Sequence, residues 1–189
     1  MFPYEVEVPS TSTYEGLEFI DEGATASVFK VRHRLENKEY ALKKVKISSK
    51  QKDQKALEDE IIYHKLYLPN HPNILKANDI FKSGNSICMV MDLCSTTLES
   101  VIDEHKNVPL WFKMRVARQL TTGLDVLFER SIIHRDIKPK NILLQGSNYS
   151  NYIVKIGDFG LARRLALSAL FTTHAVGTPL YMAPEIPQH

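Results

Sequence analysis

The residue types best suited to chemistry gather in the second half of the chain. Residues 134–141 read His-Arg-Asp-Ile-Lys-Pro-Lys-Asn, Asp158-Phe159-Gly160 follows, and residues 183–185 read Ala-Pro-Glu. Carboxylates are hard oxygen ligands that suit Mg²⁺. Phosphoryl transfer needs the charge on the phosphates to be neutralised and a nucleophile to be held in line. The acids and lysines of these segments are residue types that such a reaction uses.

The order of these three segments resembles the eukaryotic protein kinases, whose motifs are H-R-D…N, D-F-G and A-P-E. Each tripeptide alone is a weak signal, and the three in this order are a strong one. The resemblance covers residues 14–185. It implies an α+β, two-lobed fold with a β-rich N-lobe that holds one helix. The helical C-lobe would be incomplete, because the family's catalytic domain continues well beyond A-P-E.

The resemblance gives each polar side chain of these segments a role. Asp136 would accept the hydrogen bond of the substrate hydroxyl and orient it, and Lys138 would reach the transferring phosphate. Asp158 would bind the Mg²⁺ that bridges the phosphates, and Asn141 would offer an amide oxygen to a second metal ion. The implied reaction moves the γ-phosphate of ATP to a protein Ser/Thr hydroxyl. The other interpretation of Asp136 is a loop acid paired with Arg135.

Lys43 is the expected partner of the ATP phosphates in the first half of the chain. Residues 41–43, Ala-Leu-Lys, match the family's V-A-I-K, whose lysine holds the α/β-phosphates and pairs with a helix glutamate. The alternative is a solvated strand lysine. Glu60 is the favoured partner because its surroundings resemble the family's helix, and Glu58 is the other candidate because two isoleucines fall on its helix face.

The phosphate-binding loop departs from the family's G-x-G-x-x-G-x-V. The corresponding positions are Asp21, Gly23, Ala26 and Val28, so one glycine of three remains. Glycines there let the backbone approach phosphates closely, and an acid beside a polyanion is unfavourable if it points inward. We expect a weaker affinity for ATP within an unchanged fold.

An adenine pocket between the lobes is also implied by the resemblance. Val28 and Ala41 would lie on one side of the ring and Leu143 on the other. Met91 would close the back of the pocket, and Asp92-Leu93-Cys94 would be the hinge that reads the adenine edge. Ordinary core packing is the other interpretation of the apolar members.

Two features predict specificity and regulation. Lys138 and Gly177-Thr178 favour a Ser/Thr kinase over a Tyr kinase by resemblance. Arg135 suggests activation by a phosphate on Thr172 or Thr173, placed by an activating kinase or by autophosphorylation, since a phosphate pairs well with arginine. The alternative is that these threonines are ordinary loop hydroxyls.

The subgroup signals conflict. Residues 23–29 with Arg32-His33 resemble the IκB-kinase-related group. Residues 154–156 and 181–185 are more similar to the Unc-51-like group. Both subgroups stay open.

Hydrophobic periodicity predicts the elements that position these residues. Strands are expected within 14–47, at 74–81 and 87–93, and at 141–145 and 152–157, and helices at 53–68 and 109–130. Leu110, Met114, Ala117, Leu120, Leu124 and Leu127 form one apolar face of the second helix. By resemblance, helices after A-P-E would cover this face, so we expect much of it to have no partner in this chain. We expect three parts: a tail over 1–13, an N-lobe and hinge over 14–94, and a partial C-lobe over 95–189.

Composition narrows the class of protein. The 189 residues are 43% apolar and 24% charged, which is typical of a globular chain. Their net charge of +2 excludes a strong nucleic-acid field or a polybasic membrane surface. Cys88 and Cys94 fit a reducing compartment, and neither a signal peptide nor a membrane span is visible. We expect a cytoplasmic or nuclear protein that acts on protein substrates, with no nucleic-acid or membrane partner.

Two functions from different classes remain. The first is an active protein Ser/Thr kinase that uses ATP and Mg²⁺. The second is a catalytically inactive truncated fragment that binds a nucleotide or a partner. The catalytic residues favour the first, and the C-lobe helices that the sequence lacks favour the second for this chain.

Overall fold

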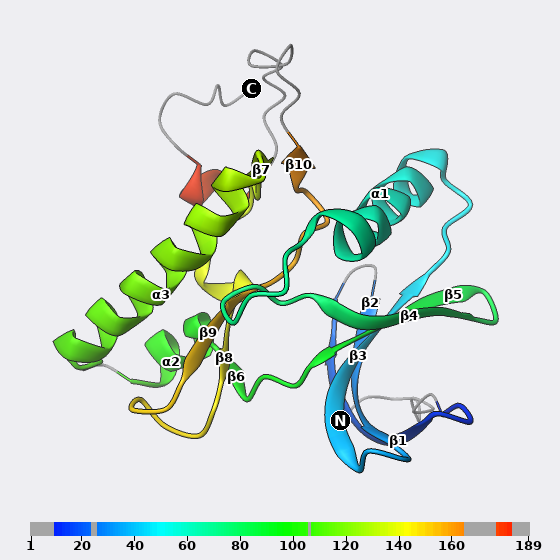
Figure 1. Cartoon of the computed structure of the whole chain (residues 1–189), viewed down its shortest axis with the longest axis horizontal. Coiled ribbons are helices and arrows are strands. Elements are labelled where there is room, and N and C mark those ends of the chain that lie inside the picture. The colour runs from blue at the N-terminus through cyan, green and yellow to red at the C-terminus, as the bar shows by residue number, and fades with distance from the viewer. Residues whose placement is uncertain (1–9, 24–25, 106, 165–176, 183–189) are drawn as a thin grey trace. The chain divides into compact units, whose positions relative to one another are not determined.

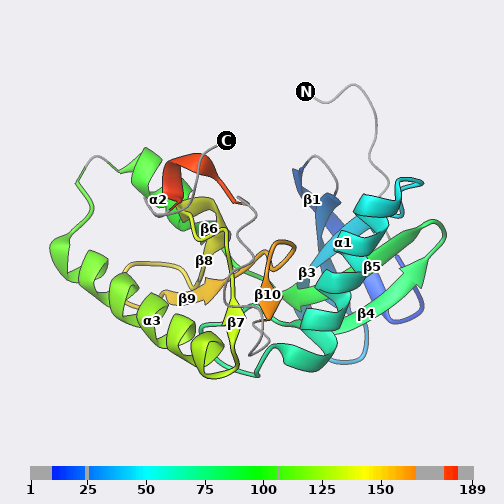
Figure 2. The same cartoon turned by 90° about the horizontal axis from the view of Figure 1, so that it is seen from above.

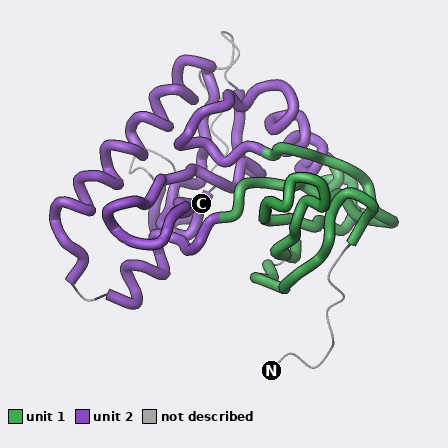
Figure 3. The backbone as a smooth tube through the Cα atoms, turned by 60° about the horizontal axis from the view of Figure 1, so that its bottom comes forward, with its two compact units in different colours: residues 1–54, 77–93 green, residues 55–76, 94–189 purple. Residues whose placement is uncertain are grey.

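The computed structural model describes residues 10–23, 26–105, 107–164 and 177–182. The chain divides into two compact units (Figure 3). Unit 1 takes residues 1–54 and 77–93, and unit 2 takes residues 55–76 and 94–189. Within the described ranges, no helix is both long and apolar enough to cross a membrane.

Unit 1 is built on one antiparallel sheet (Figure 1). Its strands are β1 (Tyr14–Glu22), β2 (Ala26–His33), β3 (Lys38–Lys46), β4 (Ala77–Ser83) and β5 (Ser86–Asp92), in the order β1-β2-β3-β5-β4. Apolar residues alternate along the strands, and the most deeply buried side chains include Phe29, Val31, Leu42, Cys88 and Val90. The predicted strands within 14–47 are confirmed.

The two outer strands of this sheet are joined by side chains. The Tyr14 hydroxyl of β1 donates to the Asp79 carboxylate of β4 at 3.2 Å, and the Tyr14 ring stacks on Phe81. Burial, and then the neighbouring Asp79 charge, raise the pKa of Tyr14 to about 12. The sheet therefore curls so that its first and last strands meet around the core.

Unit 2 combines helices with short strands. Its elements are α1 (Gln51–Ile62, which begins in unit 1), a π-helical turn (Tyr63–Tyr67), β6 (Thr96–Thr97), α2 (Leu98–Glu104), α3 (Leu110–Glu129), β7 (Ile132–Ile133), β8 (Ile142–Gln145), β9 (Ile153–Ile156) and β10 (Arg163–Arg164). The strands form a β6-β8-β9 sheet and a β7-β10 pair. The long helix α3 lies beside β9 (Figures 1 and 2).

The predicted helix 53–68 is correct in its body and wrong at its ends. It starts at Gln51 and leaves α-helical geometry after Ile62. The extra residue in the π-helical turn rotates the chain, so Tyr63 and His64 are buried while Leu66 is 72% exposed. The predicted strand 74–81 likewise begins only at Ala77, because Ile74 forms a single parallel bridge with Ile156 in unit 2.

Among the described residues, the first half of the predicted apolar face of α3 lacks cover, as expected. Leu110 and Met114 are 71% and 65% exposed, and Ala117 is exposed as well. The helix instead turns inward the face that carries Phe112, whose ring stacks on Tyr149 with centroids 4.5 Å apart. Both faces are apolar, so periodicity alone could not choose between them. The buried residues of α3 are Phe112, Val116, Gly123 and Leu127.

Periodicity also missed α2, which Thr97 caps by accepting a hydrogen bond from the Ser100 backbone N–H at 3.1 Å. The chain passes from unit 1 to unit 2 after Leu93, within the predicted hinge Asp92-Leu93-Cys94. Residues 55–76 belong to unit 2, whereas the sequence-based division puts them in the N-lobe. The three-part division of the chain stays a prediction.

Candidate active site

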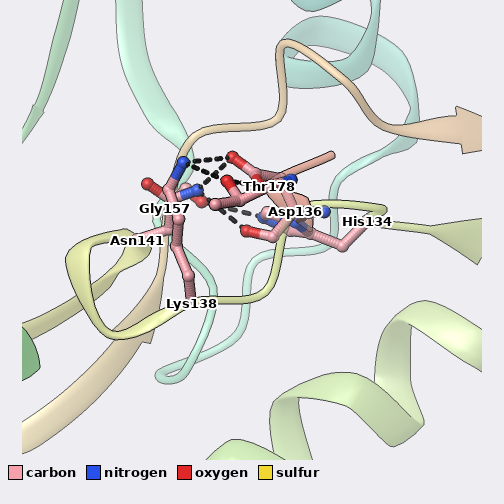
Figure 4. A network of polar contacts seen from close by, with 6 residues as sticks. All are labelled: His134, Asp136, Lys138, Asn141, Gly157 and Thr178. Carbon is pink, nitrogen blue, oxygen red and sulfur yellow. Dashed lines mark hydrogen bonds and ion pairs between the residues drawn. The ribbon is translucent and has the colours of Figure 1, made fainter. Parts of the chain in front are cut away.

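The segment from His134 to Asn141 holds a dense set of polar contacts around Asp136 (Figure 4). Lys138 Nζ lies 2.8 Å from Asp136 Oδ2. The Asn141 side-chain nitrogen donates to the same oxygen at 2.9 Å and to the Asp136 carbonyl at 2.8 Å. Thr178 donates its hydroxyl to Asp136 Oδ1 at 2.6 Å and its backbone N–H at 3.0 Å. Both carboxylate oxygens of Asp136 are thereby fixed in place.

These contacts keep the Asp136 carboxyl ionised. The residue is only 7% exposed, and burial alone would raise its pKa. Hydrogen bonds from Lys138 and Thr178, together with the Lys138 charge, outweigh burial and lower the pKa of Asp136 below its ordinary value. At neutral pH, Asp136 is therefore a fixed acceptor of hydrogen bonds.

Backbone geometry explains how the segment reaches this shape. Arg135 adopts a positive φ of 68°, which turns the chain between His134 and Asp136. Gly177 has a φ of 125°, and a Cβ there would lie 2.4 Å from the Arg135 carbonyl oxygen. Only glycine fits this approach, and the close approach brings Thr178 to Asp136.

His134 joins the segment to β9 and the residues after it. Its Nε2 lies 2.8 Å from the Gly157 carbonyl, and the Asp136 backbone N–H donates to its Nδ1 at 3.3 Å. One ring nitrogen therefore donates and the other accepts, which is the neutral imidazole. Burial lowers the pKa of His134 and favours the same neutral form.

The ring of Phe159 lies within reach of two histidine rings in unit 2. Its centroid is 4.9 Å from that of His134 and 6.0 Å from that of His64. All three side chains are at most 3% exposed. This packing anchors Phe159, which directly follows Asp158.

Asp158 and Asn141 are the predicted metal ligands. Asp158 is exposed and has a φ of 60°, which turns it away from the path of β9. Because the Asn141 amide nitrogen donates to Asp136, its Oδ1 is the atom that could ligate a cation. Carboxylate and amide oxygens suit Mg²⁺. Among the described residues, no group of three or more His, Cys, Asp or Glu side chains is arranged to hold a metal ion.

The two candidate glutamates of α1 differ in burial. Glu60 is 7% exposed, whereas Glu58 is exposed. A Cβ on Gly160 would lie 3.6 Å from Glu60 Oε2, so Glu60 lies beside the Asp158-Phe159-Gly160 segment. Burial favours Glu60 as the partner of Lys43, which lies half-buried in β3 of unit 1. Their pairing stays a prediction.

The predicted nucleotide-binding residues fall in both units. In the sheet of unit 1, Val28 lies opposite Lys43, and Ala41 opposite Met91. Asp92 ends β5 in the same sheet. Cys94 and Leu143 belong to unit 2. The adenine pocket that would join them stays a prediction.

The turn between β1 and β2 carries the altered loop motif. The Gly23 N–H donates to the Ala26 carbonyl at 2.8 Å. Asp21 is exposed, and its Oδ1 accepts a hydrogen bond from the Glu22 N–H at 2.8 Å. In the described conformation, the Asp21 carboxylate is engaged by the backbone of its own strand.

The predicted phosphorylation sites, Thr172 and Thr173, lie outside the described residues. The arginine predicted to receive the phosphate is described. Arg135 Nε donates to the Leu161 carbonyl at 2.6 Å. Burial and the nearby Arg163 charge lower the pKa of Arg135, and an anion placed beside the two guanidiniums would relieve their repulsion.

Two contacts escaped prediction from the sequence. Thr178 was expected only to mark Ser/Thr specificity, yet it binds Asp136 from 42 positions away. Asn73 and Gln119 hold the outer edge of β9 through side-chain hydrogen bonds. No local spacing encodes either contact, because each joins segments that are distant in sequence.

We call residues 134–141 the catalytic segment. The β-sheet unit, the helical unit and this segment define the class of the molecule, an α+β protein kinase. Comparison with known proteins supports the same class. The chain matches the protein kinase domain family over residues 14–189. The chain belongs to this family, and the predicted fold class is confirmed.

Its relatives are Ser/Thr kinases. The chain is 39% identical over 171 residues to the Serine/threonine-protein kinase ATG1c of Arabidopsis thaliana, covering 89% of this chain and 23% of that protein. It is 34% identical over 175 residues to the Arabidopsis thaliana kinase TIO, covering 92% and 13%. With the Cyclin-dependent kinase 7 of Xenopus laevis it shares 33% identity over 180 residues, covering 92% and 49%. The chain thus spans less than half the length of each.

Proposed function

We propose that this protein transfers the γ-phosphate of ATP to Ser or Thr hydroxyls of protein substrates. The observation that carries the proposal is the network around Asp136, in which Lys138, Asn141 and Thr178 fix both carboxylate oxygens. An ionised, immobilised acceptor is what orienting a substrate hydroxyl requires.

The low pKa of Asp136 defines its role in the reaction. A carboxylate that is a weak base at neutral pH does not remove the hydroxyl proton early. It accepts the hydroxyl hydrogen bond and points the oxygen at the γ-phosphorus. It takes the proton as the new P–O bond forms and the bond from the γ-phosphorus to the bridging oxygen breaks, so that ADP leaves with that oxygen. Lys138 brings positive charge to the same place, which favours an incoming phosphate.

Mg²⁺ is the expected cofactor, and Asp158 and Asn141 would hold it through oxygen atoms. When bound, the metal would neutralise the charge that develops on the phosphates. Lys43 would bind the α/β-phosphates, and Glu60 would pair with Lys43. Backbone groups of the turn around Gly23 would approach the phosphates.

The proposal is tested with Asp158→Asn in the purified protein, by transfer of ³²P from ATP to a generic basic protein. The substitution weakens one metal ligand at an exposed position, so the melting temperature should be unchanged and transfer should fall at least about a hundredfold. Undiminished transfer would contradict the assignment of Asp158.

Regulation by phosphate on Thr172 or Thr173 belongs to the same proposal. Arg135 and Arg163 supply the positive charge for such a phosphate. Replacing both threonines by alanine should lower activity, and mass spectrometry of an active preparation should find one of them modified. A fully active preparation with neither residue modified would contradict this part.

The alternative function, an inactive fragment that binds nucleotide or a partner, is favoured by one observation. Leu110, Met114 and Phe128 of α3 are 71%, 65% and 78% exposed, and large apolar side chains left in water contribute nothing to stability. Residues 1–189 expressed alone decide between the two. Nucleotide binding by a folded chain without phosphate transfer would support the alternative, whereas ATP-dependent transfer lost in Lys43→Met would exclude it.

A further inference from the structure

β9 leads directly into Asp158 and is the outer strand of the β6-β8-β9 sheet. Towards β8, Val154 lies opposite Leu144, and Ile156 lies opposite Ile142. The backbone groups of Val154 and Ile156 point to the other edge of the strand. Groups at a sheet edge need partners from elsewhere when they are buried, and both residues are fully buried. Whatever binds this edge therefore fixes the position of β9.

A short segment before β4 binds one half of the edge. The Ile156 N–H donates to the Asn73 carbonyl at 2.9 Å, and the Leu75 N–H donates to the Ile156 carbonyl at 2.9 Å. These are backbone bonds, and they form the parallel bridge between Ile74 and Ile156. At Ile156, the backbone of residues 73–75 therefore takes the place of a neighbouring strand.

Two side chains bind the other half of the edge. The Val154 N–H donates to Gln119 Oε1 at 3.0 Å, and Asn73 Nδ2 donates to the Val154 carbonyl at 2.8 Å. Asn73 Nδ2 also reaches Gln119 Oε1 at 3.2 Å, which links the two amides. Gln119 Nε2 donates to the Tyr152 carbonyl at 3.2 Å. We call Asn73 and Gln119 the edge clamp.

The side chains and backbone around the edge clamp are tightly packed. Asn73 is only 6% exposed. A Cβ on Gly123, one helical turn beyond Gln119, would lie 2.9 Å from Ile156 Cδ1 and 3.1 Å from both the Cβ and the carbonyl oxygen of Asn73. The backbone of α3 thus lies against the clamp. A displaced clamp amide would lose hydrogen bonds at a site with little access to water, which is costly.

We propose that Asn73 and Gln119 are positioning residues for Asp158. They fix the position of β9 in its sheet. Asp158 follows Ile156, the last residue of β9, by two residues. Loss of the clamp lets the end of β9 shift and misplaces the carboxylate, which weakens cation binding. The inference rests on the proposed function only in taking Asp158 as a cation ligand.

The test uses Gln119→Met in the purified protein, which keeps the length of the side chain and removes the amide. Mn²⁺ is titrated in the presence of AMP-PNP and followed by electron paramagnetic resonance, so catalysis is not required. We expect at least a threefold weaker Mn²⁺ affinity and faster hydrogen exchange in peptides covering residues 153–160. Asp158→Asn removes the carboxylate ligand itself, so its Mn²⁺ affinity shows how large the decrease is when the ligand is lost completely.

The matched control is Val116→Ala, which removes buried apolar atoms from the same face of α3. It should lower the melting temperature and leave the Mn²⁺ affinity unchanged. Should Gln119→Met fail to fold, Gln119→Glu keeps the oxygen that accepts from Val154, and an affinity between those of the parent and Asp158→Asn is expected.

Each outcome of this test bears either on the inference or on the proposed function. Equal Mn²⁺ affinity in the parent and the Gln119 variants would overturn the inference, and so would an equal loss in Val116→Ala. A parent protein that binds no Mn²⁺ with AMP-PNP would instead contradict the proposed function. In that case, unchanged hydrogen exchange at residues 153–156 in Gln119→Met would overturn the inference that the edge clamp holds β9 in position, and faster exchange would support it.

Discussion

The catalytic segment of unit 2 and the β1–β2 turn of unit 1 are expected to interact with phosphate in different ways. In the first, side chains do the work, and Asp136 is held from both of its oxygens. In the second, the backbone is expected to do the work, and the Asp21 carboxylate accepts a hydrogen bond from the adjacent Glu22 N–H. A site built from side chains needs particular residue types, whereas a site built from backbone groups tolerates substitutions. If these roles hold, the difference would explain why the chain has a complete H-R-D…N motif and a loop with one glycine of three.

The largest expected effect comes from breaking the side-chain site. Asp136→Asn removes the charge that orients the hydroxyl and accepts its proton, so kcat should fall at least about a hundredfold. The KM for ATP should change little, because Asp136 is assigned to the protein substrate. Steady-state kinetics with varied ATP separate the two parameters. A raised KM with an unchanged kcat would place Asp136 in nucleotide binding instead.

A smaller loss is expected at Thr178. Thr178→Ala removes a hydrogen bond to a charged group, worth about 1.5–3 kcal/mol, so kcat should fall roughly tenfold or more. The pKa of Asp136 should rise, which moves the acid limb of the kcat–pH profile to higher pH. Thr178→Ser keeps the hydroxyl and is the control. Equal profiles for Thr178→Ala and Thr178→Ser would show that the hydroxyl has no such role.

A pH effect on stability should arise from His134. Its pKa is lowered in the folded protein, so the unfolded state binds the proton more tightly. The folded state therefore loses stability as the pH falls below about 6.5, the ordinary histidine value, towards the lowered one. Thermal melts between pH 8 and pH 5 should show a smaller decrease for His134→Phe than for the parent. Parallel decreases would contradict a neutral His134.

The smallest effect is expected in the backbone site. Asp21 is exposed, and the interaction of such a charge with a nearby ion is worth about 1 kcal/mol or less. Asp21→Asn should lower the KM for ATP by roughly twofold to fivefold and leave kcat unchanged. The neighbouring Glu22→Gln is the matched control. An equal gain in Glu22→Gln would mean that net charge, rather than position, matters.

The sequence predicted what is local. The catalytic segment is contiguous, so the residue types from His134 to Asn141 indicated both the class of protein and the expected roles. Strands that alternate apolar and polar residues, such as β2 and β3, were equally clear. In each case the information lies within a few neighbouring residues.

The features that could not be predicted from the sequence depend on contacts between distant segments. Leu110 and Phe112 lie on different faces of α3, and only the stacking of Phe112 on Tyr149 decides which face is buried. The π-helical turn that rotates Tyr63 and His64 into the core leaves no periodic signal. The partnership of Thr178 with Asp136 depends on Gly177 meeting the Arg135 carbonyl, which no spacing reveals.

The central claim is that the network around Asp136 directs phosphate to an aliphatic hydroxyl. The most direct measurement incubates the purified protein with γ-³²P-labelled ATP, Mg²⁺ and a basic protein, followed by acid hydrolysis and separation of the phosphoamino acids. The account predicts label in phosphoserine or phosphothreonine, and its loss both with a chelator and in Asp136→Asn. Label in phosphotyrosine, or label that persists in Asp136→Asn, would contradict it.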